Sequence, residues 1–192
     1  MYLEKKKKEL LALSIITLII CTLFWAYPQR YQYFYPLLHT VPYHIQDNPF
    51  YCGEACIQMV LEFYGVQPLP SQNEIAIETN FSQNTTYAEY MEKPFIIRNF
   101  QVSINWTQNF DWAYNNLIQA ITTRPVIILI TWDNGDGHYL VVIQGNDKGI
   151  SYHDPLNGKN KQMDKELLRA LWLTNCIKYP PQPSCWILVV SR

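Results

Sequence analysis

Cys52 stands where the sequence best suits covalent chemistry. It opens a segment, residues 52–64, whose apolar residues recur at the spacing of one helix face, and Gly65 follows as a helix terminator. The apolar residues of this face are Ala55, Cys56, Met59, Val60 and Phe63. A thiol in the first turn of a helix faces the positive end of the helix dipole and free backbone N–H groups, which stabilise the thiolate form. Cys52 is therefore a candidate nucleophile, whereas Cys56, one turn further along the apolar face, is expected to be a small core residue.

A nucleophilic cysteine needs a base, and His138 is the histidine best placed to supply it. It directly precedes a short apolar strand, 139–143, and follows a loop rich in Gly and Asp. The next predicted strand, 150–153, ends at His153, and Asp154 follows it. If the two strands form a hairpin, Asp154 lies across from His138 and is placed to fix the tautomer of its imidazole. His153 then points to the opposite face of its strand and is expected to be structural.

The other ligand-type side chains do not form a metal-binding pattern. The four histidines are His39, His44, His138 and His153. No two of them stand at a spacing typical of zinc ligands, so a zinc site that includes Cys52 and Cys56 is not expected. The loop aspartates Asp133, Asp136 and Asp147 match no calcium-binding loop. We expect neither a metal nor an organic cofactor.

Composition restricts the class of protein. Of 192 residues, 48% are hydrophobic and 15% aromatic, so a packed core is expected. The 15 Lys and Arg residues nearly balance the 16 Asp and Glu residues. A nucleic-acid partner is not expected, because such proteins need a basic face to neutralise phosphates. Five cysteines are too few for a disulfide scaffold.

An apolar segment near the N-terminus predicts a membrane anchor. Residues 10–27 carry no charge and are nearly long enough to cross a hydrocarbon core, and Lys5 to Lys8 precede them. The positive-inside rule then places the N-terminus in the cytoplasm and everything after residue 28 outside. A cleaved signal peptide, which would release a secreted domain, has the same charge order and is the alternative. The small residues near Trp25 and Ala26 make a poor cleavage site.

Two further features fit an oxidising location outside the cytoplasm. Glycosylation sequons occur at residues 80–82, 84–86 and 105–107, although the tripeptide is common by chance. Cys176 and Cys185 flank a proline-rich loop and form a disulfide candidate. Two separate buried thiols are an equally good interpretation of the pair.

The chain is expected to comprise three parts: the lysine run and anchor at 1–28, a juxtamembrane linker at 29–45, and one domain at 46–192. Beyond the helix at 52–64, helices are predicted from Ser71, over 112–122 and over 163–172. Strands are predicted over 125–130, 139–143, 150–153 and 186–190. Helices come first and antiparallel strands follow, which favours an α+β domain of two layers.

Three motifs together resemble one enzyme family. The stretch 46–56, QDNPFYCGEAC, resembles the signature of the bacteriocin-processing, double-glycine peptidases, a papain-like group of cysteine peptidases. The segment from His138, HYLVV, resembles the family's catalytic histidine strand, and Asp154-Pro155 followed by Gly158 resembles its Asp-Pro turn. The motifs occur in the family's order with family-like spacing. The resemblance implies a papain-like fold in which N-terminal helices pack on an antiparallel sheet.

The resemblance also implies a role for each matching residue. Cys52 would be the nucleophile, His138 the general base and later acid, and Asp154 the residue that orients His138. Gln46 would donate to the oxyanion, joined by the backbone N–H of Cys52.

The departures from the family leave the substrate open. Many members carry this domain on the cytosolic face of a peptide exporter and cut leaders after a double glycine. This chain has one apolar span and an expected domain outside the cytoplasm. The expected function is therefore a membrane-anchored, extracytoplasmic cysteine peptidase acting on a peptide or protein substrate. An amidase or acyl transferase using the same thioester, and a non-catalytic peptide-binding module, are the alternatives.

Overall fold

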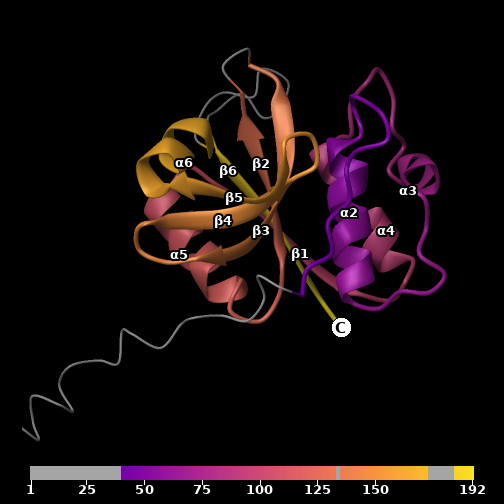
Figure 1. Cartoon of the computed structure of the whole chain (residues 1–192), viewed down its shortest axis with the longest axis horizontal. Helices are drawn as coiled ribbons and strands as arrows, with labels where there is room; N and C mark the ends of the chain where they lie inside the picture. Colours follow the sequence, from indigo (N-terminus) through magenta and orange to yellow (C-terminus); the bar gives the residue numbers. More distant parts are fainter. Residues whose placement is uncertain (1–39, 133–134, 173–183) are drawn as a thin grey trace, which may run out of the picture. The chain divides into compact units, whose positions relative to one another are not determined.

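A computed structural model describes residues 40–132, 135–172 and 184–192 (Figure 1). By its internal contacts the chain divides into two units, residues 1–34 and residues 35–192. The expected membrane span at 10–27 lies outside the described residues, so it stays a prediction. Among the helices of the described ranges, none is both long and apolar enough to cross a membrane.

The centre of the domain is a six-stranded sheet with the strand order β1-β6-β2-β3-β4-β5. Every neighbouring pair is antiparallel, as the sequence predicts. The strands are β1 (Gln101–Thr107), β2 (Val126–Thr131), β3 (Gly137–Gly145), β4 (Gly149–Asp154), β5 (Gly158–Asp164) and β6 (Cys185–Ser191). The four predicted strands correspond to β2, β3, β4 and β6. The two edge strands, β1 and β5, were not predicted.

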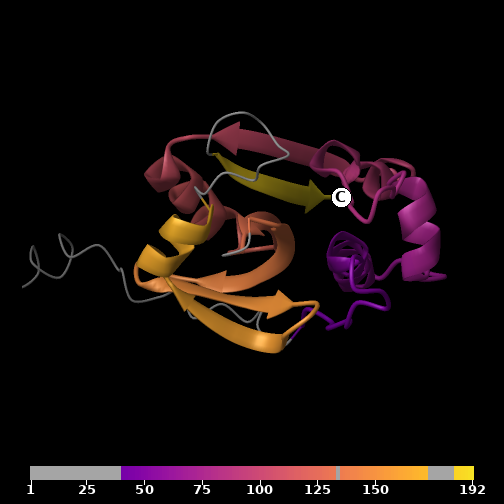
Figure 2. The same ribbon diagram turned by 90° about the horizontal axis from the view of Figure 1, so that it is seen from above.

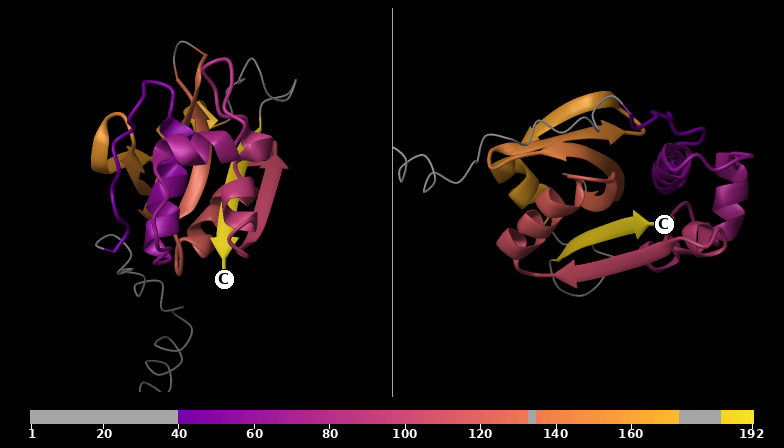
Figure 3. Two further views of the ribbon diagram at one scale, coloured as in Figure 1. Left: turned by 90° about the vertical axis from the view of Figure 1, so that its right-hand side faces the viewer. Right: turned by 90° about the horizontal axis from the view of Figure 1, so that it is seen from below.

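The N-terminal helices lie together on one face of the sheet. They are α2 (Cys52–Phe63), α3 (Gln72–Glu78), the short 3₁₀ helix η2 (Ala88–Tyr90) and α4 (Lys93–Ile96). The view from below shows α2 between the sheet and α3 (Figure 3). The capping box predicted from Ser71 is present. The Glu74 backbone N–H donates to Ser71 Oγ, and the Ser71 backbone N–H donates to the Glu74 carboxylate.

The helices α5 (Phe110–Ala120) and α6 (Lys165–Trp172) lie on the opposite side of the sheet from α2 (Figure 2). The side chains of β2 are apolar on both faces of the sheet, so both faces must be buried by helices. Ile127 and Leu129 belong to the hydrophobic cluster of α2, whereas Val126, Ile128 and Ile130 belong to the cluster of α5 and α6. The α+β class is therefore confirmed, but the prediction of two layers was wrong: α5 and α6 form a third layer.

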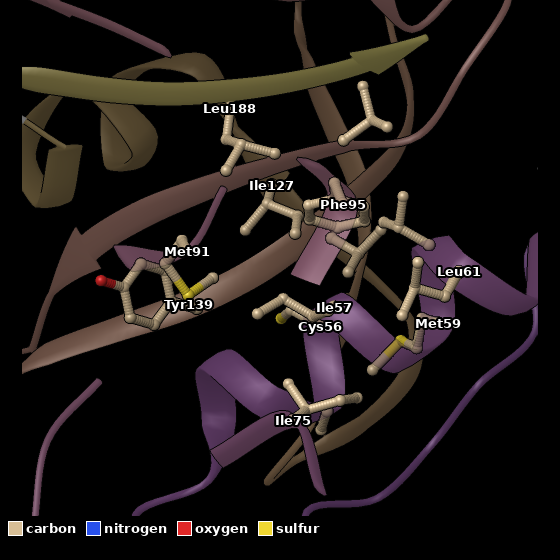
Figure 4. Close-up of a cluster of buried hydrophobic side chains, with 14 of the residues drawn as sticks. Cys56, Ile57, Met59, Leu61, Ile75, Met91, Phe95, Ile127, Tyr139 and Leu188 are labelled. Atoms are coloured by element: carbon tan, nitrogen blue, oxygen red, sulfur yellow. The ribbon is translucent and has the colours of Figure 1, made fainter. Parts of the chain in front are cut away.

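The core between α2 and the sheet holds the first turn of α2 in place. Figure 4 shows side chains of α2, among them Cys56, Ile57 and Leu61, gathered with Ile127 and Tyr139 of the sheet. All of these side chains except Tyr139, which is almost buried, are completely buried. Burial of each large apolar side chain contributes about 1.5–3 kcal/mol. The position of α2 on the sheet is thus determined by close packing along most of its length.

Gly149 allows a close approach of the β4 and β5 backbones at the end of the hairpin away from its turn. A Cβ added to Gly149 would lie 2.3 Å from the Met163 carbonyl oxygen and 2.9 Å from the Asp164 Cα. These are backbone atoms of the paired strand, so they can move only by disturbing the pairing. We expect Gly149→Ala to lower the free energy of unfolding by roughly 1–3 kcal/mol, measured by urea denaturation. Lys161→Ala, an exposed change on the same hairpin, should stay within about 0.5 kcal/mol of wild type. An unchanged urea midpoint in Gly149→Ala would contradict this packing.

Candidate active site

Cys52 is the first residue of α2 and is partly exposed. The N-cap residue, Tyr51, makes no side-chain capping hydrogen bond. The first backbone N–H groups of α2 are therefore not occupied by the Tyr51 side chain. These N–H groups favour a negative charge at the position of Cys52. The predicted placement of a thiol at a helix N-terminus is confirmed.

His138 and Asp154 meet across neighbouring strands. His138 lies near the start of β3, and Asp154 is the last residue of β4. The Nε2 atom of His138 is 2.8 Å from Oδ1 of Asp154, and both side chains are buried. The contact predicted from hairpin geometry is confirmed, because antiparallel pairing brings the start of one strand beside the end of the other.

The turn after β4 supplies Asp154 with three further hydrogen bonds. Its Oδ1 accepts from the backbone N–H groups of Leu156 and Asn157 at 2.9 and 3.0 Å. Its Oδ2 accepts from Nδ2 of Asn157 at 2.9 Å. Burial by itself raises the pKa of Asp154, but these bonds and the charge of His138 lower it to about 2. Asn157 was missed in the sequence; an amide three residues after an aspartate in an Asp-Pro turn was the available signal.

Cys52 and Asp154 flank His138. Burial by itself lowers the pKa of His138, but hydrogen bonds with Asp154 and with the Cys52 thiol, and the charges of both, raise it to about 9. The Trp132 ring lies over the imidazole with its centroid 5.1 Å away, at an angle of 49°. The arrangement favours an imidazolium between the Cys52 sulfur and the Asp154 carboxylate, which is the order of groups that a cysteine nucleophile, its base and an orienting residue require.

Gln46 precedes α2 and is tied to the turn that holds Asp154. Its backbone N–H donates to the Pro155 carbonyl at 3.0 Å. Its side-chain Nε2 donates to the Asn48 carbonyl at 2.9 Å, which leaves the second N–H of that amide for another acceptor. The Oε1 atom is buried and has no hydrogen-bond partner among the described residues. The oxyanion role of Gln46 stays a prediction.

The residues predicted to be structural behave as core groups. Cys56 is completely buried, and burial, followed by the charge of Cys52, raises its pKa well above that of an ordinary thiol. His153 donates from Nε2 to the Val41 carbonyl at 3.1 Å and accepts at Nδ1 from the Asn160 N–H at 3.2 Å. Burial lowers the pKa of His153, so the neutral form is favoured. Both predictions are confirmed.

Two other expectations concern residues that the structure describes only in part. Cys185 is buried on β6, whereas Cys176 lies outside the described residues, so their pairing stays a prediction. Within the described ranges, no three His, Cys, Asp or Glu side chains are grouped to hold a metal ion. Asp133 of the loop aspartates also lies outside these ranges.

A partly exposed thiol at a helix N-terminus, facing a buried His–Asp pair on an antiparallel sheet, is the arrangement of a papain-like cysteine peptidase. A model of the Peptidase C39 family matches residues 40–184. The chain therefore belongs to the Peptidase C39 family and is a cysteine peptidase, a hydrolase acting on peptide bonds. The family resemblance seen in the three motifs is confirmed.

Solved structures with the same fold include three peptidases. The Streptococcus ComA peptidase domain, from a bifunctional ABC transporter involved in quorum sensing, is 19% identical with a TM-score of 0.60, covering 78% of this chain and 98% of that one. A double glycine motif protease from an AMS/PCAT transporter, in complex with the leader peptide, is 18% identical with a TM-score of 0.57, covering 78% and 90%. A putative C39-like peptidase from Bacillus anthracis is 13% identical with a TM-score of 0.57, covering 81% and 97%. At these identities the similarity shows the fold alone. No curated protein matches the chain.

The site predicts that His138 stays protonated to unusually high pH. Its folded-state pKa of about 9 lies above the ordinary value of 6.5. Its interactions therefore stabilise the fold fully below about pH 6.5, and this stabilisation is lost as the pH rises through about 9. We expect a histidine NMR titration to give a His138 midpoint near 9 in wild type. In Asp154→Asn the midpoint should fall, because the charge opposite Nε2 is gone. Midpoints near 6.5 in both proteins would contradict this electrostatic pairing.

Proposed function

We propose that Cys52, His138 and Asp154 cleave a peptide bond, with Gln46 stabilising the oxyanion. The observation that carries the proposal is the buried imidazole of His138, which is hydrogen-bonded to Asp154 and whose pKa is raised by both Asp154 and the Cys52 thiol at the start of α2. The thiolate of Cys52 attacks the peptide carbonyl carbon, and charge develops on the carbonyl oxygen. Gln46 and the Cys52 backbone N–H donate to that oxygen.

The proton balance follows from the state of His138. The imidazolium gives its proton to the leaving amine, the carbon–nitrogen bond breaks, and a thioester to Cys52 remains. The neutral imidazole then takes a proton from water, whose oxygen attacks the thioester. The thioester carbon–sulfur bond then breaks, which releases the carboxylic acid and restores the Cys52 thiolate and the His138 imidazolium. Asp154 keeps the imidazole oriented through both halves.

For the substrate, we propose a peptide leader with two glycines before the scissile bond. Family membership supports this class of substrate. A double glycine motif protease with the same fold has been solved in complex with its leader peptide, which supports it further.

For the location, we propose that residues 10–27 anchor the chain and that the peptidase domain lies outside the cytoplasm. The support is the sequence: an uncharged span preceded by Lys5 to Lys8, with Arg30 as the only Lys or Arg between the span and Lys93. A domain held outside would meet exported peptides rather than leaders still in the cytoplasm.

Cleavage is tested with a synthetic peptide that contains a double glycine and with a matched peptide in which both glycines are replaced by leucine. The first should be cut after the second glycine and the matched peptide far more slowly. Cys52→Ala should abolish cleavage, and Gln46→Ala should lower kcat about 10²–10³-fold. Products are identified by mass spectrometry. Full activity in Cys52→Ser would rule out Cys52 as the nucleophile. Equal cutting of both peptides would rule out the proposed substrate class but not the nucleophile.

The topology is tested by adding protease to sealed cells that express the full chain with a C-terminal tag. We expect the tag to be lost without lysis, because the domain faces outward. A cytosolic marker protein in the same cells should stay intact. A tag protected until lysis would contradict the orientation, and a tagged soluble fragment in the medium would show that the segment is a cleaved signal.

A further inference from the structure

Glu54 carries a carboxylate that the proposed reaction does not use, in the same helical turn as Cys52. Glu54 is in the first turn of α2, two residues after Cys52, and its side chain is completely buried. Burial raises the pKa of Glu54, and hydrogen bonds from Thr86 and Thr79 oppose that rise. A buried carboxylate is costly unless it is hydrogen-bonded, so its contacts indicate why it is there.

Two hydroxyl groups from outside α2 bind Glu54. The Thr86 hydroxyl lies 2.6 Å from Oε1 and 2.7 Å from Oε2 of Glu54. The Thr79 hydroxyl, at the end of α3, donates to Oε1 at 2.9 Å. Glu54 therefore attaches both α3 and the segment before η2 to the turn of helix that carries Cys52.

The Thr86 contact continues to the strand of His138. The Thr86 carbonyl accepts a hydrogen bond from the Tyr139 hydroxyl at 3.0 Å. Tyr139 directly follows His138 in β3. A continuous series of hydrogen bonds thus runs from Glu54 on α2 through Thr86 to Tyr139 on β3. It joins the element of the nucleophile to the element of the base.

Packing makes this connection stiff. A Cβ added to Gly53 would lie 3.0 Å from the Thr86 Cβ and 3.0 Å from the Met91 Sδ. The residue directly after Cys52 therefore has its backbone in close contact with Thr86. Thr86 itself is buried, so water does not compete for its bond to Glu54.

We propose that Glu54 is a positioning residue of the peptidase, which through Thr86 and Tyr139 holds the Cys52 thiol at the right separation from the His138 imidazole. The inference rests on the proposed function of Cys52 and His138. Glu54 itself is not placed to touch substrate, and it acts through the two elements that it joins.

The test measures the thiolate of Cys52 without a substrate. Iodoacetamide labels the full chain at pH 6 and at pH 9.5, and mass spectrometry reads the rate at Cys52. Alkylation consumes thiolate, and a free cysteine with a pKa of about 8.5 is less than ~1% thiolate at pH 6. Fast labelling at pH 6 therefore reports the pairing with His138.

Thr86→Val removes the hydroxyl while keeping the shape of the side chain. We expect it to lower the labelling rate at pH 6 about tenfold, with less than a twofold change at pH 9.5, because a small displacement of a catalytic pair costs rate steeply. Thr86→Ser, which keeps the hydroxyl, should restore most of the rate. Tyr139→Phe should lower the rate at pH 6 as well. The double variant should lose no more than the larger single one, because both act through one connection.

A matched control separates positioning from lost stability. Ile150→Val removes one methylene from the other hydrophobic cluster, at an expected cost of about 0.5–1.5 kcal/mol, and should leave the labelling within twofold of wild type. Wild-type labelling at pH 6 in Thr86→Val would overturn the inference, as would an equal loss in Ile150→Val. Failure of the proposed function would give a different result. The Cys52 of the wild-type chain would then be labelled no faster at pH 6 than a free cysteine, and His138→Ala would leave that labelling rate unchanged.

Discussion

The buried hydrogen bond between His138 and Asp154 is the interaction on which the candidate site depends. Both side chains are almost fully removed from water, where an unpaired charge would be strongly unfavourable. Each group favours the charged form of the other, and the turn at Asn157 supplies the carboxylate with further donors. The imidazole cannot turn away without leaving a buried carboxylate short of a partner. The bond at Nε2 therefore fixes the orientation of the His138 ring.

The position of the thiol depends on packing that involves no polar chemistry. The apolar face of α2 lies against β2 and β3 in a core with completely buried side chains, so the first turn of the helix cannot shift without opening cavities. The cover of the opposite face by α5 and α6 fixes the sheet itself. The buried hydrogen-bonded pair and the apolar cores on the two faces of the sheet together determine the positions of Cys52 and His138.

Local environment decides the role of chemically identical residues. Cys52 and Cys56 lie one turn apart on α2, yet of the two only Cys52 is partly exposed and contributes to the raised pKa of His138. Cys56 is completely buried, and its raised pKa keeps it a neutral thiol. The adjacent histidine and aspartate of β4 divide in the same way. His153 ties the segment at Val41 to β5, while Asp154, on the other face of the strand, serves the site.

The sequence by itself determined the elements whose signals are local. The period of α2 predicted a thiol at a helix N-terminus, which is observed. The hairpin of β3 and β4 predicted that His138 and Asp154 meet, and that contact is observed as well. The edge strand β5 escaped prediction because it is mostly polar and exposed, so alternation is weak. The edge strand β1 does alternate, with Val102, Ile104 and Trp106 at every second position, and that signal was missed. The strand β1 pairs with β6, far away in the chain, and only the tertiary structure decides such a pairing. The same holds for α5 and α6 as a third layer and for Glu54, whose partners Thr79 and Thr86 come from separate segments. A buried carboxylate has no periodic signal, because its stability comes from donors that only the completed fold brings to it.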